Sequence, residues 1–240
     1  MSPKHWRWIS ALVVGGLLMA ACAGPQEATE APAGEEPAAP APTIAPAPPA
    51  EKKVATFIFT EEFDTLNPYY TNMWFSEITH QLWNVWPWQF DDTNAVYPVM
   101  LTEMPTVENG GITEEGRVLT LSLRDDLTWS DGEPLTANDF VFTYEMIVDP
   151  NNAVASAYPY DEAVASVEAP DDLTVVVTFN EAFIPWASSL WQGLLPEHIL
   201  RPVYEAEGTI DNAEWNHAPT VGSGPYVFAE WESGSFTRFV

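Results

Sequence analysis

The sequence predicts a mixed α+β / α/β fold, and three observations support this prediction. Leu119, Leu121 and Leu123 alternate with polar residues, as in a strand with one buried face. Residues 174–179 alternate in the same way, with apolar residues on one side. Between these segments, apolar residues recur at helical spacing over 140–147. Strand and helix patterns that follow one another in one chain indicate a mixed domain.

Two elements are expected before residue 90. Residues 54–60 are rich in β-branched and aromatic residues and predict a strand. Residues 75–85 predict a helix whose buried face carries Phe75, Ile78 and Leu82.

The strand that ends near Leu123 leads into a turn and then a helix. Residues 130–132 read Ser-Asp-Gly, a turn sequence in which Asp bonds its own downstream backbone and Gly tolerates a positive φ. Thr136 and Asp139 have the spacing of a capping box, so the helix should begin directly after Thr136. Pro150 is expected to end it.

The C-terminal region predicts further strands. Residues 223–225 form a turn signal, and 224–231 should be a strand after it. Phe239 and Val240 lie inside what the pattern predicts as the next strand. The sequence is therefore expected to be a piece of a longer protein.

The N-terminus has the organisation of a bacterial lipoprotein signal. A basic start is followed by an apolar run over 8–19 and by Ala20-Ala21-Cys22, a small-residue cleavage site that ends in the only cysteine. A transmembrane anchor is the alternative, but the apolar run is shorter than the ~20 residues that a spanning helix needs. We expect residues 1–22 to be a signal peptide and Cys22 to carry a lipid.

Residues 23–51 are mostly Ala and Pro with scattered Glu, a composition that cannot bury enough apolar surface to fold. They are expected to be a disordered tether before a folded part at 52–240. The chain's 11 Trp and 12 Phe can supply a sizeable core. The formal charge of −27 argues strongly against nucleic-acid binding, although it does not separate a cationic ligand from a simple solvated surface.

Four ordered motifs then carry a family resemblance. They are the run LRDDLTWSDGEPLTANDF from Leu123, Thr-Leu-Asn-Pro at 65–68, Leu-Pro-Glu-His-Ile-Leu at 195–200, and Gly-Ser-Gly-Pro-Tyr at 222–226. Together they resemble the family 5 extracytoplasmic solute-binding proteins, the peptide, nickel and oligosaccharide receptors of ABC importers. The resemblance covers residues 54–240.

The resemblance implies a periplasmic-binding-protein-like type II fold, with two lobes and a small extra subdomain around a cleft. By this comparison, 52–79 and 166–240 belong to lobe one, and 80–165 forms the extra subdomain. The second lobe is expected to be missing from this sequence.

In peptide-binding members, the loop after the Leu-Asn-Pro motif lies against the ligand. By resemblance, the ligand-binding residues here are Tyr70, Asn72, Met73 and Trp74. Their aromatic rings offer flat apolar area, and Asn72 offers both donors and acceptors. The alternative is that Tyr69, Tyr70 and Trp74 are ordinary core residues.

Other aromatic residues allow two interpretations. Trp83, Trp86 and Trp88 could stack on sugar rings, but large aromatic residues at this spacing more often pack an interior. Trp129, beside the Ser-Asp-Gly turn, is expected in the core. Gly222, Gly224 and Pro225 are expected to be structural.

No pattern points to catalysis or to a cofactor. The acidic pairs Asp125/Asp126 and Asp131/Glu133 bracket turns, where Asp is common for local hydrogen bonding. A Gly-x-Ser-x-Gly elbow is absent from the sequence. His80, His198 and His217 are far apart in sequence, so a metal site is not expected.

The sequence therefore predicts a lipid-anchored receptor that is not an enzyme and needs no cofactor. It would sit on the outer face of the cytoplasmic membrane or in the periplasmic space, bind an oligopeptide by lobe closure, and present it to the permease subunits of an ABC importer. An oligosaccharide is the alternative ligand. A lipid-anchored sensory or adhesion domain that has lost transport is the alternative function.

Overall fold

The computed structural model describes residues 53–240. The signal peptide and tether predicted for 1–22 and 23–51, together with Cys22, lie outside the described residues. The chain divides into a unit that ends at Val54 and a unit of residues 55–240, and the fold below is that of the second unit. None of the helices in this described part is long and apolar enough to cross a membrane.

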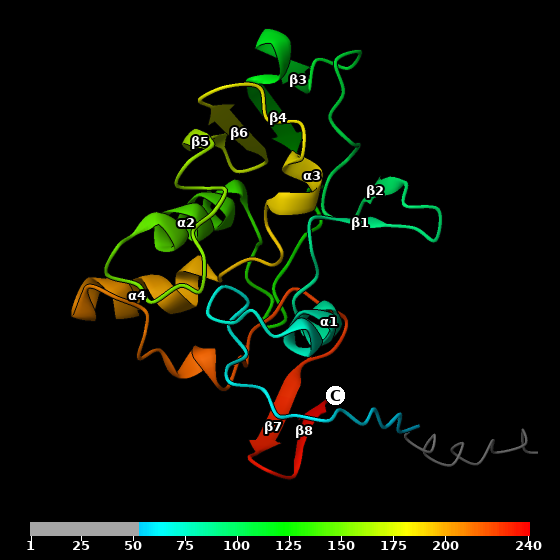
Figure 1. Cartoon of the computed structure of the whole chain (residues 1–240), viewed down its shortest axis with the longest axis vertical. Coiled ribbons are helices and arrows are strands. Elements are labelled where there is room, and N and C mark those ends of the chain that lie inside the picture. The colour runs from blue at the N-terminus through cyan, green and yellow to red at the C-terminus, as the bar shows by residue number, and fades with distance from the viewer. Residues whose placement is uncertain (1–52) are drawn as a thin grey trace, which may run out of the picture. The chain divides into compact units, whose positions relative to one another are not determined.

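The largest sheet of the described residues is four-stranded and antiparallel, and it lies toward the upper end of the view in Figure 1. The strand order is β3-β4-β6-β5, and β6 pairs on one side with β4 and on the other with β5. Alternate residues of β4 and β6 are buried, as period-2 patterning predicts for a sheet with one covered face. The strands are β3 (Ile112–Thr113), β4 (Val118–Ser122), β5 (Val164–Asp171) and β6 (Thr174–Phe179).

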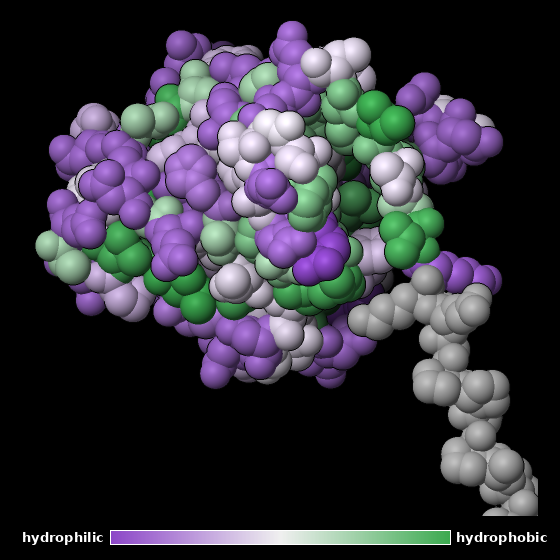
Figure 2. All heavy atoms as spheres, turned by 90° about the horizontal axis from the view of Figure 1, so that it is seen from below, coloured by the Kyte–Doolittle hydropathy of each residue, from purple (hydrophilic) through white to green (hydrophobic). Residues whose placement is uncertain are grey.

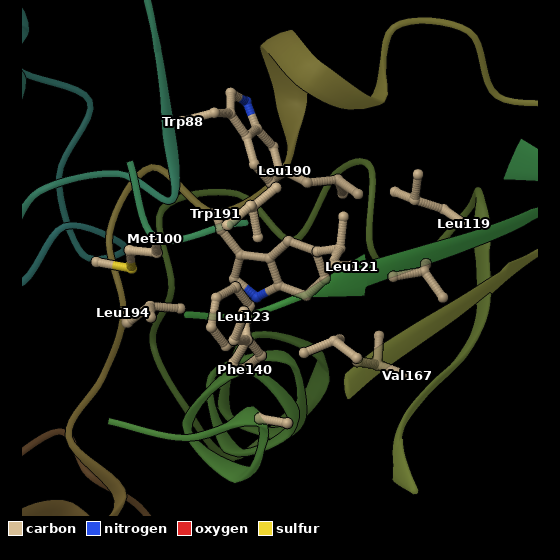
Figure 3. Packing of buried hydrophobic residues seen from close by; sticks show 14 of the residues in the cluster. Trp88, Met100, Leu119, Leu121, Leu123, Phe140, Val167, Leu190, Trp191 and Leu194 are labelled. Carbon is tan, nitrogen blue, oxygen red and sulfur yellow. The ribbon is translucent and has the colours of Figure 1, made fainter. Parts of the chain in front are cut away.

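Helix α2 (Ala137–Val148) covers the buried face of this sheet and completes the main core. Figure 3 shows the indole of Trp191 between side chains of the sheet and Phe140 of α2. The ring centroids of Phe140 and Trp191 are 5.2 Å apart in an edge-to-face arrangement. A strand, a helix and a loop therefore share one densely packed interior.

A second core lies where α1 (Trp74–Trp83) and α4 (Glu197–Glu207) meet the back of α2. Its large members are Leu66, Trp83, Phe142, Leu200 and Trp215, all buried. The remaining elements are short: α3 (Trp186–Ser189), the 3₁₀ turns η1 (Glu114–Gly116) and η2 (Glu214–Asn216), and the hairpins β1 (Trp88–Phe90) with β2 (Val96–Pro98) and β7 (Phe228–Glu232) with β8 (Phe236–Phe239).

The central elements agree with the sequence prediction. The predicted strand after residue 118, the 130–132 turn and the 174–179 strand are all present. Helix α2 begins after Thr136, and Thr136 and Asp139 form the predicted capping box. Each of these elements has a complete local signal for both its type and its boundary.

The strand predicted for 54–60 is wrong. This segment makes no strand pairing among the described residues, and the exposed fractions of Phe57 and Ile58 are 71% and 92%. β-propensity states only that a segment suits a pleated surface, so without a neighbouring strand it does not produce one.

The first helix is confirmed, but its predicted buried face is only partly right. Phe75 is buried, whereas Ile78 is half exposed. The inner face instead carries Ser76, Thr79 and His80. A hydrophobic count cannot detect an inner face that is largely polar.

The strand predicted for 224–231 begins later, at Phe228. The amides of Gly224 and Tyr226 instead donate to the carbonyls of Trp83 and Leu82, at 2.8 and 3.0 Å. These bonds fasten the Gly-Ser-Gly-Pro-Tyr segment to the end of α1.

The four-stranded sheet takes strands from both sides of the division expected near residue 165. β3 and β4 come from the segment assigned to the extra subdomain, and most of β5 and all of β6 come from the segment assigned to lobe one. The division into lobe one and subdomain stays a prediction.

Candidate ligand-binding segment at the start of the first helix

The Thr-Leu-Asn-Pro motif is held by a buried polar network with Asn216. The Thr65 hydroxyl and the Leu66 amide both donate to the Asn216 carbonyl at 2.8 Å. The Asn67 side-chain amide donates to Asn216 Oδ1, also at 2.8 Å. Thr65, Asn67 and Asn216 are all buried, so these bonds satisfy groups that water cannot reach. The network fixes the backbone that enters the candidate segment.

Two tyrosines anchor the segment itself. The Tyr69 hydroxyl donates to the Gly193 carbonyl at 2.7 Å, and the Tyr70 hydroxyl donates to Asp211 Oδ1 at 2.6 Å. Burial first, and then Asp211, raise the pKa of Tyr70 above its ordinary value. The Tyr70 hydroxyl is therefore already used within the protein, and only its half-buried ring and backbone remain for other contacts.

The next residues turn outward. Thr71 is buried, and its hydroxyl accepts a hydrogen bond from the Met73 amide at 3.0 Å. Asn72 is exposed, Met73 is half-buried, and Trp74 is 64% exposed. The structure thus separates the four residues that the sequence singled out: Tyr70 faces its own protein, while Asn72 and Trp74 are open to solvent.

Helix α1 begins at this segment without a side-chain cap. The amides of Ser76 and Glu77 donate to the Met73 carbonyl, but Met73 has no polar side chain to accept from the first turn. Helix N-terminal amides are hydrogen-bond donors at the positive end of the helix dipole. The segment can therefore offer an aromatic surface, an amide side chain and a helix start.

Two glycines let the 222–226 loop pack closely against the C-terminal end of α1. A Cβ on Gly222 would lie 2.1 Å from the Trp83 carbonyl oxygen, and one on Gly224 would lie 2.6 Å from that of Leu82. Such separations are far inside van der Waals contact, so only glycine lets the loop pass here. The structural role predicted for these glycines is confirmed, and its cause is close packing rather than a positive φ.

His80 lies on the inner face of α1 and is 1% exposed. Burial lowers its pKa to about 4, while a hydrogen bond to the Leu66 backbone and the charge of Asp64 act in the opposite direction. Its Nε2 and the Ser76 hydroxyl are buried without a hydrogen-bond partner among the described residues. In this part of the chain, no group of three or more His, Cys, Asp or Glu residues is placed to hold a metal ion.

The remaining tryptophans are largely structural. Trp83, Trp88 and Trp129 are at most 1% exposed, which confirms the core interpretation for these three. The Trp88 indole donates to the Ala187 carbonyl at 2.6 Å, and Trp83 packs edge-on against Trp215. A buried indole offers no face on which a sugar could stack.

A second surface feature is an open groove of about 330 Å³ where the Ser-Asp-Gly turn meets the start of α4. His198 Nε2 lies 2.9 Å from Asp131 Oδ2. Partial burial acts to raise the pKa of Asp131, but hydrogen bonds from His198 and the Glu133 amide hold it below its ordinary value. Sequence reasoning did not predict that these two motifs meet.

Asp139, at the floor of this groove, serves two helices. One carboxylate oxygen accepts from the Thr136 amide at 2.9 Å and the other from the Glu197 amide at 3.1 Å. Burial raises the pKa of Asp139, and these two donors partly offset the increase. The sequence predicted the cap on α2, but it gave no signal for the second bond to α4.

One carboxylate of each acidic pair considered for catalysis is used in contacts within the protein. Asp126 forms an ion pair with Arg124 at 2.6 Å, and Asp131 is paired with His198. Asp131 also accepts from the Glu133 amide at 3.2 Å, as a turn aspartate does.

Comparison with known proteins identifies the family. The sequence model described as "Bacterial extracellular solute-binding proteins, family 5 Middle" matches residues 95–240. The chain belongs to this family. Its members are extracytoplasmic or periplasmic solute-binding proteins, and the chain covers only their N-terminal portion.

Curated relatives agree with this assignment. Protein XP55 of Streptomyces lividans is 34% identical over 144 residues, which are 59% of this chain and 24% of the relative. The probable D,D-dipeptide-binding periplasmic protein DdpA of Escherichia coli is 28% identical over 51% of this chain and 23% of its own length. The chain thus spans about a quarter of these relatives.

Solved structures show the same fold. NikZ from Campylobacter jejuni, in complex with Ni(L-His), is similar with a TM-score of 0.62 and 25% identity over 75% of this chain and 33% of that one. The oligopeptide-binding protein AppA from Bacillus subtilis, in complex with a nonapeptide, has a TM-score of 0.63 and 23% identity over 74% of this chain and 34% of its own. These neighbours are two-lobed binding proteins of type II fold, of which this chain matches about a third.

Proposed function

We propose that this chain is part of the substrate-binding lipoprotein of an ABC importer, which captures an oligopeptide outside the cytoplasm and delivers it to permease subunits. The observation that carries the proposal is the match of residues 95–240 to the family 5 solute-binding proteins. The protein itself performs no chemistry in this role.

The candidate segment suits a peptide. Asn72 has an exposed carboxamide that can both donate to and accept from a peptide backbone. Trp74 offers an exposed aromatic face for a side chain of the ligand. We assign Tyr70, Asn72, Met73 and Trp74 to the ligand contact, with Tyr70 acting through its ring or backbone because its hydroxyl is bound to Asp211.

Two relatives support this ligand class by their names. DdpA is described as a D,D-dipeptide-binding protein, and AppA as an oligopeptide-binding protein. An oligosaccharide is less well supported here, because Trp83 and Trp88 are buried and Trp74 alone remains as an exposed indole near the segment. No observation favours a sensory or adhesive role.

Membrane attachment and domain division are further parts of the proposal. A lipid on Cys22 would anchor the protein, and residues 23–51 would act as a tether of up to roughly 90 Å at about 3.1 Å per residue. Residues 52–79 and 166–240 would form lobe one, with 80–165 as the extra subdomain.

The test is peptide capture by the purified complete receptor that contains this chain, because the chain matches only about a third of its two-lobed structural neighbours. The receptor is incubated with a pool of synthetic tri- to pentapeptides, and bound peptides are identified by native mass spectrometry and measured by calorimetry. Trp74→Ala and Asn72→Ala should each weaken binding about tenfold, equivalent to about 1.4 kcal/mol. Tyr97→Ala, which removes an exposed aromatic residue of the β1–β2 hairpin, is the matched control and should bind as the wild type does. Capture of no peptide would refute the proposed function.

A further inference from the structure

The outer face of α1 carries large apolar side chains where a polar surface is expected. Trp74 and Ile78 are 64% and 50% exposed. They are four residues apart on a helix and are therefore neighbours on one face. Glu77, three residues after Trp74, belongs to the same face and is half-buried. Figure 2 shows hydrophobic residues, in green, interrupting the mostly hydrophilic surface of the molecule on the side seen from below.

This face adjoins the candidate ligand segment without a break in the chain. Trp74 is both the last residue of the segment and the first residue of α1. The buried side of the helix is fixed by Phe75, His80 and Trp83, so the outer face cannot rotate inward without unpacking the second core. A ligand that contacts Asn72 and Trp74 can therefore extend along Glu77 and Ile78.

The charges of the described residues favour a cationic partner for this face. Every arginine in this part of the chain lies within 3.2 Å of one of the protein's own carboxylates, so each of these positive charges is already paired within the protein. These pairs are Arg117 with Glu114, Arg124 with Asp126, Arg201 with Glu197 and Glu145, and Arg238 with Glu230. The chain as a whole carries a formal charge of −27.

We propose that the α1 face formed by Trp74, Glu77 and Ile78 binds the ligand through an apolar side chain next to a cationic group, so that the receptor selects basic apolar peptides over acidic ones. This inference rests on the proposed function and deepens it. The Glu77 carboxylate would pair with the cation, and the Trp74 ring would attract it through its negative face. Ile78 would cover the apolar side chain.

The long-range field acts in the same direction. A strongly negative protein attracts cationic ligands and repels anionic ones, which changes the association rate more than the final contacts do. The selection should therefore weaken as salt screens the charges.

Three synthetic pentapeptides of equal length and apolar content test the inference: Lys-Phe-Lys-Phe-Lys, Ser-Phe-Ser-Phe-Ser and Glu-Phe-Glu-Phe-Glu. Affinities for the complete receptor that contains this chain are measured by calorimetry at about 20 mM and about 300 mM NaCl. The basic peptide is expected to bind at least about tenfold more tightly than the acidic one at low salt, and this ratio should shrink at high salt.

Variants separate the face from the total charge. Glu77→Gln should lower the affinity for the basic peptide and leave the affinity for the neutral peptide unchanged. Trp74→Ala should lower both affinities. Glu108→Gln removes the same charge from an exposed position outside α1 and should change neither affinity appreciably. Equal losses in Glu77→Gln and Glu108→Gln would overturn the inference, because total charge and not this face would then determine selection.

The remaining outcomes are equally decisive. If the acidic peptide binds as tightly as the basic one, the inference is wrong while the proposed function stands. If none of the three peptides binds and the pooled peptides also fail, the proposed function fails and the inference with it. Sedimentation of the wild type and of Trp74→Ala tests whether the face instead binds a second copy of the protein. If the wild type is a dimer and the substitution dissociates it without changing peptide affinity, the inference is wrong and the face is a contact between two copies.

Discussion

His80 makes the stability of this domain depend on pH in a window where most carboxylates are still ionised. Its folded pKa of about 4 lies below the ordinary value of 6.5, because burial disfavours the charged imidazolium. Between these two values the unfolded chain binds a proton that the folded chain does not. The stability that His80 contributes is therefore complete above pH 6.5 and is lost as the pH falls toward 4.

The size of the effect follows from the two pKa values. Each pH unit inside the window changes the free energy of unfolding by about 1.4 kcal/mol. Between pH 7 and pH 5, His80 alone should lower it by about 2 kcal/mol. This is a large share of the stability of a typical domain.

His80→Phe keeps an aromatic ring of similar shape and removes the titration. Urea unfolding is followed by tryptophan fluorescence at pH 7, 6 and 5, with Trp83 as a close reporter because its ring centroid is 5.7 Å from that of His80. The wild type should lose about 2 kcal/mol more than the variant over this range. His217→Gln changes an exposed histidine and should retain the wild-type slope.

Wild type and variants share the same carboxylates, so the contribution of these groups to the pH dependence of the free energy of unfolding cancels in the comparison. A His80→Phe protein with the same pH dependence as the wild type would show that His80 is not held neutral by burial. If His217→Gln instead reduced the dependence of the free energy of unfolding on pH, the effect would belong to His217 and not to His80.

Substitutions at three other positions test separate parts of the chain. Asp139→Ala should lower the free energy of unfolding by about 3 kcal/mol in urea titrations, since it leaves two helix amides without an acceptor. Asp139→Asn should lower it less, because one acceptor remains. Equal, small losses in the two variants would contradict the role of Asp139 as the acceptor for both helices. Gly222→Ala should cost about 3 kcal/mol or prevent folding, because its Cβ would meet the Trp83 carbonyl, and a thermal midpoint equal to the wild type would disprove this close approach. Cys22→Ser should move the protein from the membrane to the soluble fraction when it is expressed in a bacterium, whereas unchanged partition would indicate another anchor.

The sequence was sufficient for the elements whose signals are local. The strand at β4, the turn at 130–132 and the capped start of α2 each combine a periodicity with a boundary residue. These signals agree with one another and with the final packing, so tertiary structure had nothing to override.

The misses share a different cause. The 54–60 segment has strand propensity but lacks a pairing partner among the described residues, and pairing is decided by other parts of a chain. The inner face of α1 is occupied by Ser76, Thr79 and His80, so hydrophobic spacing pointed partly to the wrong side. Both outcomes depend on contacts that are distant in sequence.

The candidate segment shows the same limit on a smaller scale. Nothing in the local order of residues distinguishes Tyr70 from Trp74 as a surface residue. The difference comes from Asp211, 141 positions away, whose carboxylate accepts the Tyr70 hydroxyl and holds that ring against the protein. Trp74 has no comparable anchor among residues 53–240 and is exposed.

Two of the four motifs that predicted the family support α1. The Thr-Leu-Asn-Pro motif fixes the chain before the helix through Asn216, and the Gly-Ser-Gly-Pro-Tyr segment binds the carbonyls at its end. Asn84, directly after α1, exchanges two hydrogen bonds with Leu194 beside the Leu-Pro-Glu-His motif. The exposed side chains of Asn72, Trp74 and Ile78 and the half-buried side chain of Glu77 lie between these supports and belong to none of the motifs. Under the proposed function, the supports hold the backbone of the helix while its outer face contacts the ligand, so the motifs would predict the receptor family but not its substrate.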